Sequence, residues 1–113
     1  MTELSPTLQS LADTASITHA RIQQDFANIN PVIGVNQGMR KAGIPADVMT
    51  IDCLTTNKRI IVILHDDLPG LARYQFAFRD KDPSDDFIEI QLSSITSDLM
   101  YDWIHSYFSV TTQ

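Results

Sequence analysis

Four consecutive stretches of alternating apolar residues are the strongest structural signal in this chain. They lie between residues 48 and 92, and in each stretch every second side chain is apolar. A period of two places these side chains on one face of a β-strand. The sequence therefore predicts four strands that share one buried face, which consists of Met49, Ile51, Cys53, Ile60, Val62, Leu64, Tyr74, Phe76, Phe78, Ile88, Ile90 and Leu92.

Turns between these stretches predict how the strands pair. A turn centred on Thr56 and Asn57, a loop over residues 67–70 and a loop near Pro83 each separate two of the stretches. All three turns bring apolar residues opposite apolar residues, which favours a four-stranded antiparallel meander. The predicted pairs include Ile51 with Val62, Val62 with Tyr74, and Tyr74 with Leu92.

Apolar residues at helical spacing predict a helix at each end of the chain. Ser5 followed by Pro6 is a typical helix start, because the serine hydroxyl accepts from an unpaired amide and proline needs no donor there. The apolar stripe that follows extends to Ile29 and predicts one long helix. Ser93 or Ser94 is predicted to cap the final helix. The apolar face of that helix consists of Ile95, Leu99, Trp103, Ile104, Tyr107 and Phe108.

The segment between the long helix and the first predicted strand carries a weaker pattern. Apolar residues keep helical spacing over residues 32–42, and Gly43 suits the end of a helix. Gly34 and Gly38 lower the helix propensity of the same segment. We predict a short second helix here.

Helices at both ends and a sheet with one apolar face predict an α+β fold. Both kinds of element bury their apolar sides most simply against each other. The expected architecture is a two-layer sandwich, in which a four-stranded antiparallel meander carries the N-terminal and C-terminal helices on one face. A length of 113 residues without a linker or repeat predicts a single α+β domain over residues 1–113.

Charge and composition exclude several classes of partner. The formal net charge is −6 and the eight Lys and Arg residues are scattered, so we expect no nucleic acid partner. The apolar run over residues 60–64 is far too short to cross a bilayer, so we expect no membrane partner. The first residues do not resemble a secretory signal, and one cysteine cannot form an internal disulfide. A cytoplasmic location is the resulting expectation.

The predicted strands also have a second face, which points away from the helices. Its apolar centre, Ile61 and Ile63, is surrounded by polar and charged residues, as in many non-obligate protein interfaces. Two structural explanations stay open, because central strands favour β-branched residues on both faces and the second helix can cover this surface. The predicted protein-interface residues are Asp52, Ile61, Ile63, Arg73, Gln75 and Glu89.

Candidate catalytic groups are few. The predicted pairing separates Cys53 from His65 by five residues along the sheet, roughly 17 Å, which is too far for a nucleophile and its base. His65, Asp66 and Asp67 are residue types that bind metal or act as acid and base, but aspartates are also common in turns. We predict no catalytic residue, no metal and no cofactor.

The function that these patterns favour is non-enzymatic protein binding in the cytoplasm. The binding surface is the sheet face opposite the helices, and the expected partner is a protein, with a homodimer as the first expectation. An adaptor, chaperone or inhibitor role belongs to the same class. The alternative is a small enzyme or ligand carrier with a polar site near His65, Asp66 and Asp67.

Overall fold

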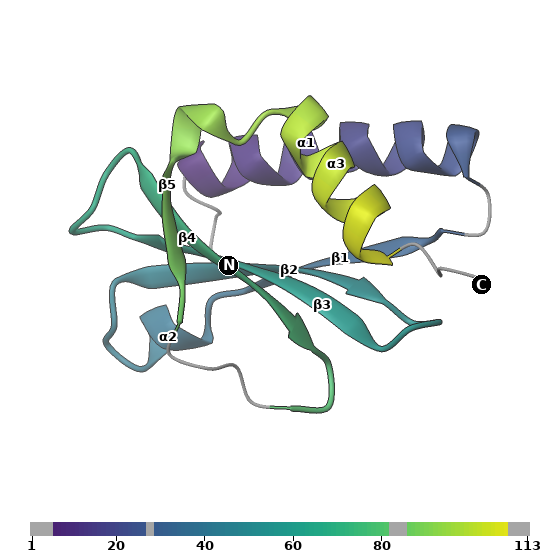
Figure 1. Cartoon of the computed structure of the whole chain (residues 1–113). Coiled ribbons are helices and arrows are strands. Elements are labelled where there is room, and N and C mark those ends of the chain that lie inside the picture. Colours follow the sequence, from purple (N-terminus) through teal and green to yellow (C-terminus); the bar gives the residue numbers. More distant parts are fainter. Residues whose placement is uncertain (1–5, 27–28, 82–85, 109–113) are drawn as a thin grey trace.

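The computed structural model of the chain describes residues 6–26, 29–81 and 86–108. The predicted helix start at Ser5 and the predicted turn at Pro83 lie outside these residues. Figure 1 shows the arrangement of the elements. In chain order they are α1 (Pro6–Asp25), β1 (Pro31–Asn36), α2 (Gly38–Lys41), β2 (Ala46–Cys53), β3 (Lys58–His65), β4 (Leu71–Phe78), β5 (Ile88–Gln91), a 3-10 turn (Leu92–Ser94) and α3 (Ser97–Phe108).

One antiparallel sheet and two helices that lie across it make up the described fold. Within the described residues the sheet has five strands in the order β1-β2-β3-β4-β5, which is a meander. Helices α1 and α3 lie together on one face of the sheet (Figure 1). The predicted α+β fold is confirmed, with one strand more than expected.

The additional strand is β1, and it replaces most of the predicted second helix. Residues 31–36 pair antiparallel with β2, from Pro31 opposite Cys53 to Asn36 opposite Val48. The predicted helix over residues 32–42 is therefore wrong for its first half, and only α2 is helical. The physical reason is that this segment is rich in β-branched residues, which suit a strand, and β2 offers it an unpaired edge.

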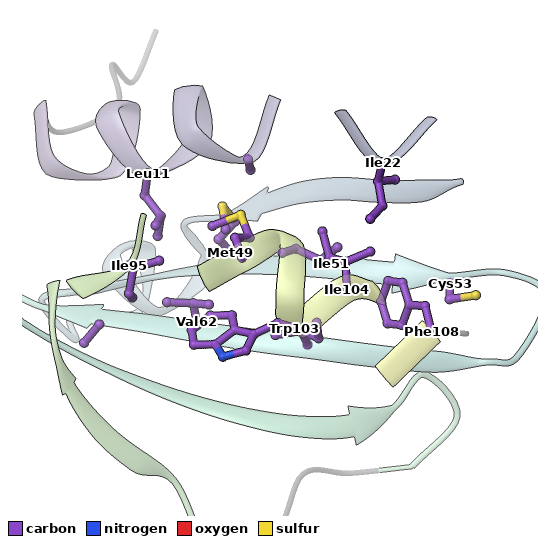
Figure 2. Close-up of a cluster of buried hydrophobic side chains, with 14 of the residues drawn as sticks. Leu11, Ile22, Met49, Ile51, Cys53, Val62, Ile95, Trp103, Ile104 and Phe108 are labelled. Atoms are coloured by element: carbon purple, nitrogen blue, oxygen red, sulfur yellow. The ribbon is translucent and has the colours of Figure 1, made fainter. Parts of the chain in front are cut away.

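The predicted buried face is confirmed on the two central strands. Met49, Ile51, Ile60 and Val62 are all fully buried (0% exposed), and they pack against residues of α1 and α3 such as Ile104. Figure 2 shows Met49, Ile51 and Val62 between the sheet and the helices, with Leu11 and Ile22 of α1 above them. The central strands therefore turn their predicted side toward the helices.

The same face is only partly buried on β4 and β5. Phe76 is 39% exposed, Phe78 43% and Ile88 56%, although all three were expected in the core. Trp103 and Tyr107 of α3 stack on Tyr74 and Phe76, but Phe78 and Ile88 stay exposed. The prediction of full burial is wrong at this edge of the sheet.

Strand registers agree with the predicted ones at one hairpin and differ at two. Val62 lies opposite Tyr74, as predicted. Ile51 lies opposite Ile60 instead of Val62, because Asn57, with a φ of 61°, ends the turn instead of centring it. Tyr74 lies opposite Ile88 instead of Leu92. The two shifts are of two and four residues, so every side chain keeps its predicted face.

Helix ends differ from the predicted ones by a few residues. Helix α1 ends at Asp25, four residues before Ile29. Helix α3 begins at Ser97, and its cap is Thr96, whose Oγ1 accepts a hydrogen bond from the Leu99 amide at 3.2 Å. The predicted caps, at residues 93 and 94, form the preceding 3-10 turn instead.

Candidate functional site

The sheet face that α1 and α3 leave uncovered carries all six predicted interface residues; we call it the outer face. The register aligns Ile63, Arg73 and Glu89 across three strands. It aligns Ile61 with Gln75, and Asp52 with Arg59 instead of with Ile61. The outer face consists of Asp52, Arg59, Ile61, Ile63, Arg73, Gln75, Ala77 and Glu89.

The two isoleucines at the centre of the outer face differ in exposure. Ile61 is only 8% exposed, between Thr50 on one neighbouring strand and Gln75 on the other. Gln75 is equally buried, and its Nε2 donates to the Asp86 carbonyl at 3.2 Å. Ile63 is partly exposed. Ile63 is therefore the better apolar contact of the two, because neighbouring side chains already cover Ile61.

Two groups of ion-paired side chains lie beside these residues. Arg59 donates two hydrogen bonds to the Asp52 carboxylate, at 2.7 and 2.9 Å, and Arg79 lies 3.6 Å from the same group. The bonds to Asp52 raise the pKa of Arg59 above its ordinary value, so the guanidinium stays charged. Arg73 and Glu89 lie 3.8 Å apart, and both side chains are about half exposed (53%). The outer face thus has an apolar centre and a charged rim.

A groove of about 320 Å³ opens beside Ile63. Arg73 and Glu89 form part of its wall, so three of the six predicted residues line it. Its apolar residues Leu71 and Phe87 were not among the predicted interface residues, although Leu71 has the outer-face parity of β4 and Phe87, just before β5, has the outer-face parity of that strand. The lining consists of Ile63, His65, Leu68, Leu71, Ala72, Arg73, Phe87 and Glu89.

The alternative site at His65, Asp66 and Asp67 does not converge on one point. His65 Nδ1 accepts a hydrogen bond from the Asp67 amide at 3.1 Å, which closes a local turn. The Asp67 carboxylate is 79% exposed and lies 3.8 Å from the same nitrogen. Asp66 is bound by Arg40. Among the described residues no three His, Cys, Asp or Glu side chains are arranged to hold a metal ion.

Arg40 joins two carboxylates at one end of the sheet. Its guanidinium binds Asp47 through two hydrogen bonds of 3.0 Å and Asp66 through two of 2.9 Å. These bonds raise the pKa of Arg40 and lower that of Asp66. The Asp47 side chain is only 2% exposed. This cluster, which we call the Arg40 clamp, ties α2, β2 and the β3–β4 loop together.

The Arg40 clamp was not predicted from the sequence. A signal for it was available, because Asp47 has the same parity as Met49 and Ile51 and therefore falls on the buried face of β2. A carboxylate at such a position needs a cationic partner. The clamp holds loops in place, and both of its carboxylates are occupied by the same guanidinium.

A second and larger groove lies at the β4 edge of the sheet, on the side of the helices. Its volume is about 590 Å³, and we call it the β4 groove. Aromatic stacking forms part of its wall, with ring centres of Tyr74 and Trp103 4.5 Å apart. Its lining consists of Tyr74, Gln75, Phe76, Ala77, Phe78, Lys81, Asp86, Ile88 and Trp103.

Comparison with known proteins adds no assignment to this geometry. None of the helices in the described part of the chain is long and apolar enough to cross a membrane. The two grooves and the Arg40 clamp are therefore the features from which a function is inferred. No family model, no curated protein and no solved structure matches this chain.

Proposed function

We propose that this protein is a non-enzymatic protein-binding domain whose outer face binds a second copy of the chain. The observation that carries the proposal is the uncovered groove beside Ile63, with the Arg73–Glu89 ion pair on its wall. An apolar centre inside a charged rim is the usual plan of a specific protein interface. A groove with one partly exposed isoleucine suits a side-chain contact better than it suits an enclosed small ligand.

The distribution of charge supports a second copy as the partner. The chain has a net charge of −6, so two copies repel through most of their surfaces. The outer face is different, because Arg59 and Arg73 accompany Asp52 and Glu89 there, and Arg79 lies next to Asp52. A surface with both signs of charge can be self-complementary across a two-fold axis. In that arrangement Arg73 of one copy meets Glu89 of the other.

A cytoplasmic location is part of the proposal. The single cysteine of the chain, Cys53, is a free thiol and is buried in the core. A buried thiol that has no disulfide partner suits a reducing compartment. The polar groups at His65 and Asp66 are engaged in a turn and in the Arg40 clamp, so they favour binding by surface over catalysis.

Ile63→Asp is expected to abolish self-association while the protein stays folded. The substitution places a charge at the apolar centre of the interface, and loss of such a contact weakens dimers by at least about 30-fold. Sedimentation velocity over a wide concentration range gives the dimer fraction. Ile17→Asp is the matched control, because Ile17 is 58% exposed on α1, away from the outer face. A wild-type protein that stays monomeric, or an Ile63→Asp dimer as tight as wild type, contradicts the proposal.

Charge reversal tests the two-fold arrangement itself. Arg73→Glu alone and Glu89→Arg alone each place like charges opposite one another, so each variant is expected to dimerise about 10-fold more weakly. An equimolar mixture of the two variants is expected to form a heterodimer, since each contact then joins opposite charges. Sedimentation of the mixture measures it. If the variants in the mixture dimerise no more tightly than each variant alone, the Arg73–Glu89 contact between copies is contradicted.

A further inference from the structure

Within the described residues, the end of strand β4 has no neighbouring strand on its outer edge. Pairing between β4 and β5 ends where Tyr74 lies opposite Ile88. Strand β4 itself continues to Phe78, and its other edge is paired with β3 along that whole length. Figure 1 shows β4 and β5 diverging toward the loop that joins them. Residues 76–78 therefore form an open strand edge in the described part of the sheet.

Two backbone hydrogen bonds fix which backbone groups of that edge face outward. The Arg79 amide donates to the Asn57 carbonyl at 2.9 Å, so odd-numbered residues of β4 bond to β3. The Leu92 amide donates to the Gly70 carbonyl at 2.9 Å, so even-numbered residues face the β5 side. The N–H and C=O groups of Phe76 and Phe78 consequently point away from β3. No backbone hydrogen bond reaches them from any described residue.

The open edge coincides with the most exposed aromatic side chains of the sheet. Phe76 and Phe78 are 39% and 43% exposed, and Ile88 across the β4 groove is 56% exposed. The Phe76 ring stacks on Tyr107 with ring centres 4.7 Å apart, which holds it in place. Exposed edges are usually protected by charge, proline or cover, because they add strands readily. This edge therefore combines backbone groups that have no partner among the described residues with apolar side-chain contacts.

We propose that the β4 groove binds an extended segment of another protein, which adds to β4 as a short strand. The open stretch from Phe76 to Phe78 spans roughly 10 Å of strand. A stable interface between folded proteins buries about 800 Å² on each partner, far more than an edge of this length offers. A single extended chain fits between β4 on one side and Ile88 on the other. Main-chain bonds supply affinity and alternate side chains supply selectivity.

The groove also indicates the chemistry of that segment. Side chains that point to the helical side lie beside Phe76, Phe78 and Trp103, so two apolar residues at alternate positions are expected. At the Phe78 end, the Lys81 ammonium lies 5.4 Å from the Phe78 ring, and the Lys58 ammonium lies 4.9 Å from the Tyr107 ring. Neither lysine has a carboxylate partner among the described residues. An acidic residue next to the apolar pair complements them.

A displayed library of random peptides tests this chemistry directly. Selection on the immobilised full chain is expected to enrich peptides with two apolar residues at alternate positions and an acidic residue beside them. The best enriched peptide, made synthetically with a fluorescent label, is the probe for anisotropy titrations. The proposal is overturned if the selected peptides share an unrelated pattern. It is also overturned if no peptide is enriched more than on a surface without the protein.

Phe78→Ala and Phe78→Pro separate the side chain from the backbone. Both variants lose the ring, and Phe78→Ala is expected to bind the probe about 10-fold more weakly. Proline removes the outward N–H as well, which alanine does not. An edge strand accepts proline at a position whose N–H points away from the sheet. Phe78→Pro is therefore expected to bind at least about 5-fold more weakly than Phe78→Ala. Equal affinities for the two variants rule out strand addition, provided that circular dichroism shows both folded.

Backbone methylation of the probe gives an independent readout. In an added strand, alternate N–H groups face β4. A methyl group on an N–H that faces β4 is expected to abolish binding, and a methyl group on the next N–H along the peptide is expected to leave binding unchanged. A helical or irregular peptide shows no such alternation. Phe78 does not belong to the outer face, so the results with the Phe78 variants can be interpreted even if the dimer test fails. Probe binding that survives Phe78→Pro but is lost in Ile63→Asp places the peptide on the outer face and refutes the β4 groove.

Discussion

Val62→Asp is expected to unfold this protein, whereas Ile63→Asp, one residue further along β3, is expected to fold. Val62 is 0% exposed and lies between Met49 and Tyr74 on the neighbouring strands. A carboxylate placed there has no partner, and its burial costs about 5 kcal/mol or more. That cost is comparable with the whole stability of an ordinary domain, about 5–15 kcal/mol. Far-UV circular dichroism and urea denaturation measure both variants.

Val62→Ala serves as the control for size. It removes two methyl groups from the core without adding charge, so a loss of about 2 kcal/mol is expected and the variant stays folded. Comparison of the two Val62 variants isolates the cost of the buried charge. If Val62→Asp folds and Ile63→Asp does not, the two faces of β3 are reversed. The outer face is then the buried one and cannot be the binding surface.

The face of each strand was predictable because it depends only on parity. The pairing of Ile51 was wrong by two residues and that of Tyr74 by four, and both errors are even. An even shift moves a side chain along the sheet without turning it over. The partners on the outer face did change, since Asp52 meets Arg59 and not Ile61. Face membership therefore followed from the sequence, but neighbours across the strands did not.

Exposure at the β4 edge was not predictable from the same pattern. Phe76 and Phe78 alternate as regularly as Ile60 and Val62, yet only the latter are buried. Burial requires a helix above the strand, and the path of α3 across the sheet depends on packing that no local pattern encodes. The β4 groove, with its open strand edge, follows from that path and was therefore invisible in the sequence.

Strand β1 was missed because spacing was weighted above residue type. Val32, Val35 and Met39 match a helical period, but Val32, Ile33 and Val35 are all β-branched. Six residues are too few for spacing to distinguish a strand from a helix. The free edge of β2 favours the strand, and that edge is a property of the folded sheet. Residue type was the better guide for so short a segment.

Arg40→Met is expected to destabilise the protein strongly, since it leaves the buried carboxylate of Asp47 without a partner. No other described side chain or backbone amide bonds to that carboxylate, which is 2% exposed. An unpaired carboxylate at such a depth costs about 3 kcal/mol. Urea denaturation measures the loss, and Arg40→Met also frees α2 from the β3–β4 loop.

Arg21→Met is the matched control, because it removes a more exposed set of contacts. Arg21 Nη1 pairs with Asp98 at 2.8 Å and donates to Ser97 Oγ at 2.8 Å, and the guanidinium lies 4.9 Å from the centre of the Tyr101 ring. The Arg21 side chain is 42% exposed and that of Asp98 is 87% exposed. Such pairs contribute less than about 1 kcal/mol. If Arg21→Met and Arg40→Met destabilise the protein equally, the Arg40 clamp is no more than a surface ion pair.

The pH dependence gives the clamp a signature of its own. Arg40 lowers the pKa of Asp66 below its ordinary value of 3.8, so Asp66 stays ionised in the folded protein at pH values where the unfolded chain binds a proton. The contribution of the Arg40–Asp66 contact is therefore complete above pH 3.8 and is lost as the pH falls through the lower folded value of Asp66. In Arg40→Met this term is missing. The stability difference between wild type and Arg40→Met should shrink on acidification below pH 3.8, whereas a constant difference shows that Asp66 is not coupled to Arg40.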